Sequence, residues 1–255
     1  MKPLAELDPR GVDAVLMDID DTLTTQGKLT ARAYAALEAL HASGKRVVPV
    51  TGRPAGWCDH MARMWPVDGV VGENGAFYFF LADGRLQRRY HDDAAMRAAK
   101  RARLGALTER ILAAVPGCAV AADQAYRETD LAIDYAEDVQ PLPLEAAERI
   151  AALMRGAGLT ARVSSIHVNG WLGDYDKLGM TRRFFAERLG IDLEREGRRA
   201  VFVGDSPNDT PMFGFFERSV GVANVRRFAL QTPPRYVTRA EAGAGFEELV
   251  AHLLA

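Results

Sequence analysis

The sequence has few cysteines, no long apolar run and almost no net charge, and each of these absences excludes a class of protein. Only Cys58 and Cys118 occur among 255 residues, in unrelated contexts. Two isolated cysteines make neither a disulfide framework nor a zinc site, so reduced and inert thiols are expected. No apolar run is long enough to cross a bilayer, and residues 1–11 lack the apolar stretch of a signal peptide. We therefore expect a soluble cytoplasmic protein with no membrane partner.

Acidic and basic residues nearly balance, so the chain has no general attraction to polyanions. The formal net charge is −2, and no basic patch or motif marks a nucleic-acid-binding surface. We expect no nucleic-acid partner, and the composition does not indicate an oligomeric state. Because 48% of the residues are hydrophobic, the chain can bury a core as a single domain or as two modest ones.

Short apolar runs alternate with helix patterns at both ends of the chain. Buried strands are expected at 12–18, 46–50, 67–71 and 200–204, shorter strands at 219–222 and 236–238, and helices at 30–43, 55–64, 177–189, 207–216 and 240–254. This alternation predicts an α/β core with a Rossmann-like, doubly wound parallel sheet.

The middle of the chain has a different rhythm. The dipeptide Asp83-Gly84 predicts a hairpin between two apolar runs. After it we expect a long helix over 93–115, two strand-like stretches between 118 and 135, a helix at 144–155 and a strand at 160–168. Hairpins mixed with helices predict an inserted α+β domain at residues 76–173, within a core made of residues 1–75 and 174–255.

Carboxylates follow two of the expected core strands. Asp18 and Asp20 come after the first strand, and Asp205 and Asp209 follow the strand at 200–204. Open α/β sheets bind ligands at the carboxyl ends of their strands. Paired carboxylates can divide nucleophilic attack and proton transfer, and hard oxygen ligands suit Mg²⁺. The structural alternatives are an acidic turn at the first position and a helix cap at the second.

Two further motifs are suited to phosphate. Thr51-Gly-Arg-Pro54 places a hydroxyl and a glycine after the second strand, where a phosphate oxygen could approach closely. Lys177, at an expected helix start, could neutralise both a phosphate and a nucleophilic carboxylate. Each motif has an ordinary alternative, because Pro54 also suits the first turn of a helix and lysines are common on helix surfaces.

Taken in order, these motifs resemble those of the haloacid dehalogenase superfamily of phosphotransferases. The matching residues are Asp18-x-Asp20-x-Thr22, Thr51, Lys177 and Gly204-Asp-x-x-x-Asp209, spread over essentially the whole chain. The insertion resembles the cap of subfamily IIB, which includes Cof-like phosphatases and the phosphatases of sucrose phosphate, trehalose phosphate and mannosyl-phosphoglycerate. Glu73-Asn-Gly-Ala76 and Val222-Ala-Asn224 also resemble that subfamily, whereas leucine directly after Lys177 departs from it.

The resemblance implies a role for each motif. Asp18 is expected to be the nucleophile and a Mg²⁺ ligand, and Asp20 the general acid/base that also gives its carbonyl to the metal. Asp205 is expected to bind the metal directly, with Asp209 as a further ligand or a neighbour of one. The phosphoryl group is expected to be held by Thr51, Gly52 and Lys177, with Asn208 supporting the lysine or the phosphate.

The predicted function is the Mg²⁺-dependent hydrolysis of a small phosphorylated metabolite, first of all a sugar phosphate, through an aspartyl-phosphate intermediate. Arg53, Asn74 and His167 are the candidate substrate contacts, although a structural hydrogen bond explains His167 as well. Two alternatives stay open: a phosphomutase of phosphosugars, and a catalytically silent binding protein on the same fold. The arginines and lysine of residues 97–110 are expected to form a solvated helix face, with recruitment of anionic substrate as the alternative.

Overall fold

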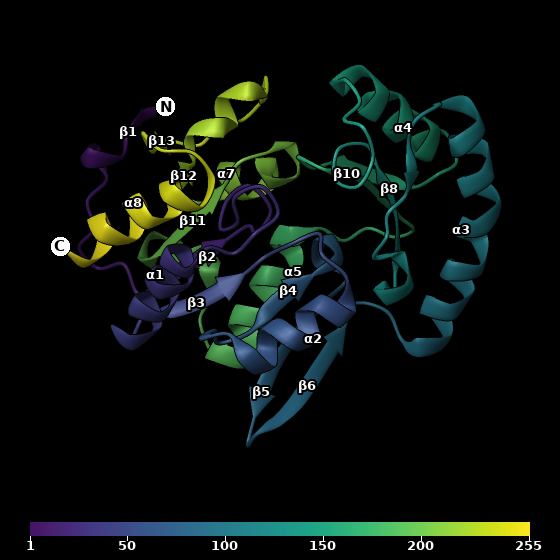
Figure 1. Ribbon diagram of the computed structural model, residues 1–255. Helices are drawn as coiled ribbons and strands as arrows, with labels where there is room; N and C mark the ends of the chain where they lie inside the picture. Colours follow the sequence, from purple (N-terminus) through teal and green to yellow (C-terminus); the bar gives the residue numbers. More distant parts are fainter.

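A parallel sheet lies at the centre of the computed structural model, which describes residues 1–255 (Figure 1). Its six strands have the order β1-β13-β12-β11-β2-β3, and every pair is parallel. The strands are β1 (Lys2–Pro3), β2 (Ala14–Met17), β3 (Arg46–Pro49), β11 (Ala200–Gly204), β12 (Arg218–Gly221) and β13 (Tyr236–Val237). From β2 the chain adds β3 on one side of the sheet, whereas from β11 it adds β12 and β13 on the other side. The boundary between β2 and β11 is thus the topological switch point of a doubly wound sheet.

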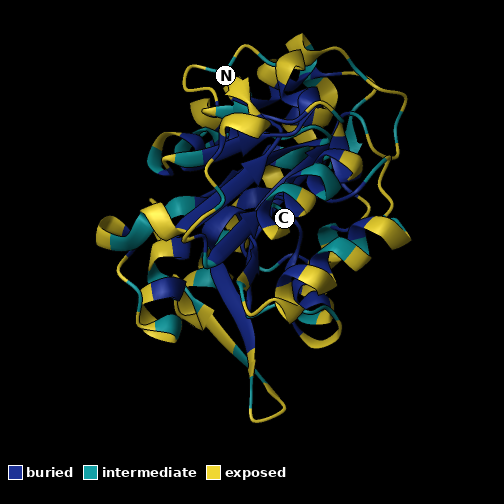
Figure 2. Ribbon diagram, turned by 90° about the vertical axis from the view of Figure 1, so that its left-hand side faces the viewer, coloured by how far each residue is buried: buried dark blue, intermediate teal, exposed yellow.

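Three further strands extend the sheet beyond β3. β4 (Val70–Gly72) is joined to the strand before it by a parallel bridge between Val50 and Val71. It pairs antiparallel with the hairpin of β5 (Phe77–Ala82) and β6 (Arg85–Tyr90), which projects at the bottom of Figure 1 and has an exposed tip in Figure 2. Although the sequence pattern placed this hairpin in the insertion, its apolar side packs against α2 (Ala55–Met64) of the core.

Helices cover both faces of the central sheet. They are α1 (Ala31–Ala42) and α8 (Ala242–Leu254) on one face, and α5 (Lys177–Phe184) and α7 (Thr210–Phe215) on the other. Side chains of β2 alternate between the two faces, because Val15 and Met17 join the cluster with Phe246 while Leu16 joins the cluster with Phe184. Each fully buried side chain of this size contributes about 1.5–3 kcal/mol of transfer free energy.

A second unit, residues 94–171, lies to one side of the core (Figure 1). Its antiparallel sheet has the order β7-β8-β10-β9. Its elements are α3 (Ala94–Ala114), β7 (Ala119–Val120), β8 (Asp130–Asp134), α4 (Leu144–Gly156), β9 (Thr160–Val163) and β10 (His167–Trp171). Leu131 and Ile133 of β8 pack beneath the two helices, so the alternating residues of β8 and β10 face the core instead.

The single strand expected at 160–168 is wrong, because the chain turns back between β9 and β10. The hydroxyl oxygen of Ser164 accepts hydrogen bonds from the backbone N–H groups of Ile166 and His167. Such serine turns compete locally with a continuous strand. The helix expected at 177–189 is also divided, since α5 passes into a π-helical turn that ends at Gly190.

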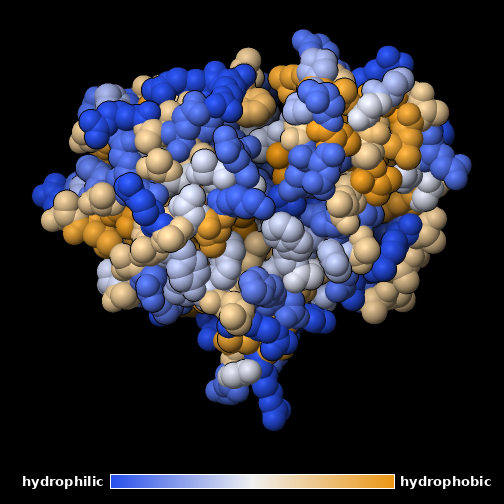
Figure 3. Space-filling view, in the orientation of Figure 1, coloured by the Kyte–Doolittle hydropathy of each residue, from blue (hydrophilic) through white to orange (hydrophobic).

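The surface agrees with the bulk composition. Figure 3 shows a mostly hydrophilic face with scattered apolar patches. None of the helices is both long and apolar enough to span a bilayer. Cys58 and Cys118 are both free thiols, as expected.

Candidate active site

Three carboxylates and one ammonium group meet at the switch point of the central sheet. Asp18 follows β2, and Asp205 and Asp209 follow β11, with carboxylate oxygens of all three within 4.8 Å of one another. Lys177 begins α5 and donates from Nζ to Asp18 Oδ1 and to Asp209 Oδ1, each at 2.7 Å. All four side chains are buried. We call these four residues the phosphoryl cluster.

The loop after β11 shows how the sequence positions Asp209. Its Oδ2 accepts hydrogen bonds from the N–H groups of Asp205 and Ser206, in a capping box at the start of the next helical turn. A side chain at Gly204 would overlap this carboxylate, so glycine is needed there. Both oxygens of Asp209 are therefore already used, one by Lys177 and one by the loop.

The phosphoryl cluster carries more negative than positive charge. Three ionised carboxylates beside one ammonium group leave two negative charges, which a single divalent cation would balance. Burial raises the pKa of Asp18 to about 7, against the opposing charge of Lys177. Burial also raises the pKa of Asp205 well above its usual range, helped by the charge of Asp18. Buried carboxylates that resist ionisation are expected where a cation belongs.

The donor set also fits a hard divalent cation. Asp205 accepts hydrogen bonds from Thr22 Oγ1 at 3.4 Å and from Asn224 Nδ2 at 3.2 Å, which orient its carboxylate. Asn224 further donates to the carbonyl of Asp21 and accepts from the N–H of Ala242. Carboxylate oxygens on rigid loops are the ligands that Mg²⁺ prefers. The sequence around Asn224 resembles subfamily IIB, but nothing local in it predicts the contact with Asp205.

Strained backbone joins the Thr51 loop to the rest of the site. Thr51 Oγ1 accepts from the N–H of Arg53, and the Thr51 carbonyl accepts from the N–H of Asn74. Glu73 and Asn74 have φ values of 42° and 54°, which cost about 1–3 kcal/mol each. Gly75 lies against the carbonyl before Lys177, where any side chain would overlap it. The turn after β4 thus fixes the loop after β3 relative to the lysine.

Arg53 forms the second acidic network of the site. Its guanidinium donates to Asp20 at 2.8–3.1 Å, to Asp123 at 3.2 Å and to Glu137 at 2.5 and 3.2 Å. The ring of Trp57 lies 4.3 Å from the guanidinium carbon. Asp20 belongs to the core, whereas Asp123 and Glu137 belong to the second unit. We call Arg53 and its three carboxylates the Arg53 network.

The other predicted substrate contacts lie around this network. His167 Nε2 is 2.8 Å from Glu137 Oε2. Burial alone would raise the pKa of Glu137, but His167 and Arg53 bring it down to about 2. The Asn74 side chain is buried and neither atom of its amide has a hydrogen-bond partner. Asn208 accepts a hydrogen bond from Ser206 Oγ at 2.8 Å.

Sequence reasoning missed the residues of the second unit that contact the core. Arg127 donates to the carbonyl of Gly52 at 2.8 Å and pairs with Asp123 and Asp130. The carboxylate of Glu73 accepts from the N–H of Thr129 at 2.7 Å. These residues lie in irregular segments or at strand ends of the insertion, where no motif or period marks them.

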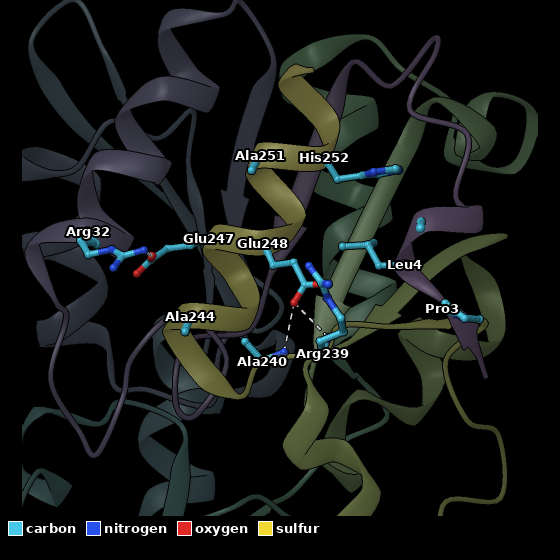
Figure 4. A pocket seen from close by; sticks show the side chains of 11 residues that line it. Pro3, Leu4, Arg32, Arg239, Ala240, Ala244, Glu247, Glu248, Ala251 and His252 are labelled. Carbon is cyan, nitrogen blue, oxygen red and sulfur yellow. Dashed lines mark hydrogen bonds and ion pairs between the residues drawn. The ribbon is translucent and has the colours of Figure 1, made fainter.

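The candidate site is closed, and a large hollow lies elsewhere. Asp18, Arg53 and Lys177 are at most 4% exposed. A hollow of about 720 Å³ lies beside α8, and ion pairs of Arg32 with Glu247 and of Arg239 with Glu248 line its wall. Figure 4 shows the side chains around it. No predicted site residue lines it. The candidate site is therefore defined by the convergence of charged groups and not by the size of a hollow.

Comparisons with known proteins agree with this geometry. A model of haloacid dehalogenase-like hydrolases matches residues 15–100. A phosphoglycolate phosphatase of Methanothrix thermoacetophila is 26% identical over 250 residues, 96% of this chain and 98% of the relative. The solved structure of Thermoplasma acidophilum 0175 has a TM-score of 0.70 and 15% identity, covering 95% of this chain and 98% of its own. A sugar phosphatase of subclass IIB has a TM-score of 0.62 and 16% identity, covering 94% and 98%.

Over residues 15–100 the chain is similar to haloacid dehalogenase-like hydrolases, and its relatives named phosphoglycolate phosphatase support the predicted class of phosphoric monoester hydrolases. The sugar phosphatase of subclass IIB shares the fold of this chain, which agrees with the predicted resemblance. The predicted fold class is confirmed as well, since the solved structures share the parallel core and the additional antiparallel sheet is present.

Proposed function

We propose that the protein is a Mg²⁺-dependent phosphatase of a small phosphomonoester, a sugar phosphate first of all, that works through an aspartyl-phosphate intermediate. The observation that carries the proposal is the phosphoryl cluster, in which Lys177 bridges Asp18 and Asp209 beside Asp205. Its arrangement suits phosphoryl transfer, which needs alignment and charge neutralisation above all.

The roles follow from the positions of the side chains. A carboxylate oxygen of Asp18 attacks phosphorus, and the bond to the leaving-group oxygen breaks as Asp20 gives that oxygen a proton. Water then attacks the aspartyl phosphate while Asp20 takes up its proton, which releases phosphate and restores Asp18. Thr51, Gly52 and Lys177 are proposed to hold the phosphoryl oxygens. Bound Mg²⁺ would supply positive charge to the phosphoryl oxygens and the attacking carboxylate.

Asp18, Asp205 and the carbonyl of Asp20 are the proposed Mg²⁺ ligands. Asp209 is the weaker candidate for direct coordination, because Lys177 and the loop after β11 already use its two oxygens. We propose that it acts mainly by holding the lysine and the Asp205 loop in place.

The inserted segment, residues 76–173, is proposed to be the cap that selects the substrate. Since the nucleophile is buried, substrate can enter only when the second unit separates from the core. That separation must break the contacts of Arg53 with Asp123 and Glu137, and those between Glu73 and Thr129. Closure would return the same contacts and exclude water. We also keep the cytoplasm as the proposed location, since both cysteines are free thiols.

The test is the release of phosphate from p-nitrophenyl phosphate, with Mg²⁺ and after chelation by EDTA. We expect turnover only with Mg²⁺, and a loss on the order of 10⁴-fold or more in Asp18→Asn, because the nucleophile is removed. Asp8→Asn is the matched control, since Asp8 pairs only with exposed Arg10. Unchanged turnover in Asp18→Asn would refute the nucleophile, and transfer to a second sugar without phosphate release would indicate a mutase.

A further inference from the structure

The Arg53 network is an unusually acidic lining for the place where the leaving group must lie. Asp20, the proposed proton donor to the leaving group, shares the guanidinium of Arg53 with Asp123 and Glu137. The side chains of Arg53 and Asp123 are 3% and 7% exposed, whereas those of Asp20 and Glu137 are 15% and 25% exposed, so water screens these charges only in part. One guanidinium cannot balance three carboxylates, and an excess of negative charge remains next to the leaving group.

The guanidinium of Arg127, which lies next to this network, does not neutralise the excess of negative charge. Arg127 pairs with Asp123, which it shares with Arg53, and with Asp130. The two arginines together therefore face four carboxylates, counting Asp20 and Glu137. His167 lies against Glu137 from β10 and is the remaining basic side chain in contact with these acids. Like charges brought into such a site repel one another, because water screens them only in part.

A separate observation indicates that a ligand with hydroxyl groups belongs here. The buried amide of Asn74 has no partner for either its oxygen or its nitrogen. It lies over Gly52, beside Asn169 Oδ1, which is on the core-facing side of β10. An unpartnered buried amide is costly unless a ligand completes it. A hydroxyl group can donate to a carboxylate and accept from an amide, so it suits both neighbours.

We propose that the Arg53 network selects substrates whose leaving group is an uncharged, hydroxyl-bearing alcohol, and that Glu137 rejects leaving groups that carry a carboxylate. The inference rests on the proposed phosphatase function and specifies its substrate class. It separates this chain from its relatives named phosphoglycolate phosphatase, because that compound carries a carboxylate on its leaving group.

Arg53 itself does not offer an open place for a substrate carboxylate. Its donors are directed at Asp20, Asp123 and Glu137, and Glu137 takes two of them. A substrate carboxylate would have to displace Glu137 and would then lie beside it. A hydroxyl group can instead insert as a donor to Glu137 and leave the ion pairs in place. Specificity of this kind comes from the repelled competitor as much as from the favoured ligand.

The experiment compares 2-hydroxyethyl phosphate with 2-phosphoglycolate, which share a two-carbon skeleton but differ in the charge of the leaving group. We expect kcat/KM of the wild-type protein to favour the hydroxyethyl compound by about tenfold or more. Glu137→Gln keeps the shape of the side chain and removes its charge, so it should lower this ratio by about tenfold. Because each ratio is taken within one variant, a general loss of activity or of cap closure cancels.

Glu109→Gln is the control, since Glu109 is an exposed acid on α3, the outer helix of the second unit (Figure 1). It should leave the ratio as in the wild type. If both small compounds turn over too slowly, the same ratio is taken from their inhibition of p-nitrophenyl phosphate hydrolysis. A wild-type preference for phosphoglycolate, or an unchanged ratio in Glu137→Gln, would overturn the inference. Inactivity towards p-nitrophenyl phosphate would instead refute the phosphatase function, and the inference with it.

Discussion

The phosphoryl cluster and the Arg53 network both hold a buried cation between carboxylates, but they differ in which units of the protein supply their residues. Each places one buried cation among carboxylates: Lys177 between Asp18 and Asp209, and Arg53 between Asp20 and Glu137. The phosphoryl cluster comes entirely from core elements, and none of its ion pairs involves the second unit. The Arg53 network needs both units. The comparison teaches that one group of charges is complete within the core and leaves an imbalance that the proposed ion would offset, while the other forms its charge pairs across the two units.

Among the substitutions that test this comparison, Lys177→Met is expected to have the largest effect on stability and activity. Removing the ammonium group leaves Asp18 and Asp209 buried without a cation, which should cost about 3–5 kcal/mol of unfolding free energy. Phosphate release should fall by at least about 10²–10³-fold, because the phosphoryl charge loses its partner. Urea unfolding without Mg²⁺ and p-nitrophenyl phosphate turnover measure the two effects.

Lys28→Met is the control for this change, since Lys28 is exposed and forms no ion pair. Wild-type stability in Lys177→Met would show that the cluster does not depend on its lysine and would contradict the assignment of a charge cluster that is complete within the core.

Arg53→Lys sharpens the comparison, because it should act on closure more than on core stability. An ammonium group cannot reach three carboxylates with a planar fork of donors, so the link between Asp20 and Glu137 should weaken. We expect kcat/KM to fall by about 10–100-fold, with a smaller loss of unfolding free energy than in Lys177→Met. Hydrogen exchange should become faster in residues 123–137 of the second unit.

Arg63→Lys, at an exposed pair with Asp59, is the control. Unchanged exchange would mean that Arg53 does not hold the two units together.

The pH dependence of stability tests the other contact between the two units. Glu73 of the core accepts from backbone N–H groups of Glu128 and Thr129, and burial, with the nearby charge of Asp130, raises its pKa from 4.5 to about 7. The folded protein therefore holds this proton more tightly than the unfolded chain does. The resulting stabilisation is complete below pH 4.5 and is lost as the pH rises through about 7.

Glu73→Gln cannot ionise, so its unfolding free energy should change less with pH over this window. Relative to the variant, the wild type should lose on the order of 1–3 kcal/mol between about pH 5 and 7.5, measured by urea unfolding without Mg²⁺. Glu145→Gln, at an exposed acid of α4, should keep the wild-type dependence. Parallel curves for the wild type and Glu73→Gln would show that Glu73 does not carry the shifted proton.

The same contrast explains what the sequence could and could not predict. Asp18 and Asp205 directly follow buried strands, and a short apolar run followed by an acid is a local pattern. The partners of Arg53 are different, because Asp123 and Glu137 lie 70 and 84 residues further along the chain. Their approach depends on how the second sheet docks, which no local pattern encodes. The turn at Ser164 was missed for a related reason, since a side-chain hydrogen bond interrupts an otherwise strand-like run.

The smallest effect is expected from substitutions on the arginine-rich face of α3, which lies away from the two charged networks. Arg97 lies over Tyr90 and pairs with Glu128, and Lys100 pairs with Asp92, so these two cations serve local contacts. Arg103 and Arg110 are exposed and form no ion pair. We expect the double variant Arg103→Gln, Arg110→Gln to keep kcat/KM within about twofold at both low and high salt, because both side chains are exposed on the outer helix and pair with no residue of the site. A several-fold loss at low salt that disappears at about 0.5 M salt would instead show that this face recruits anionic substrate, since steering depends on ionic strength.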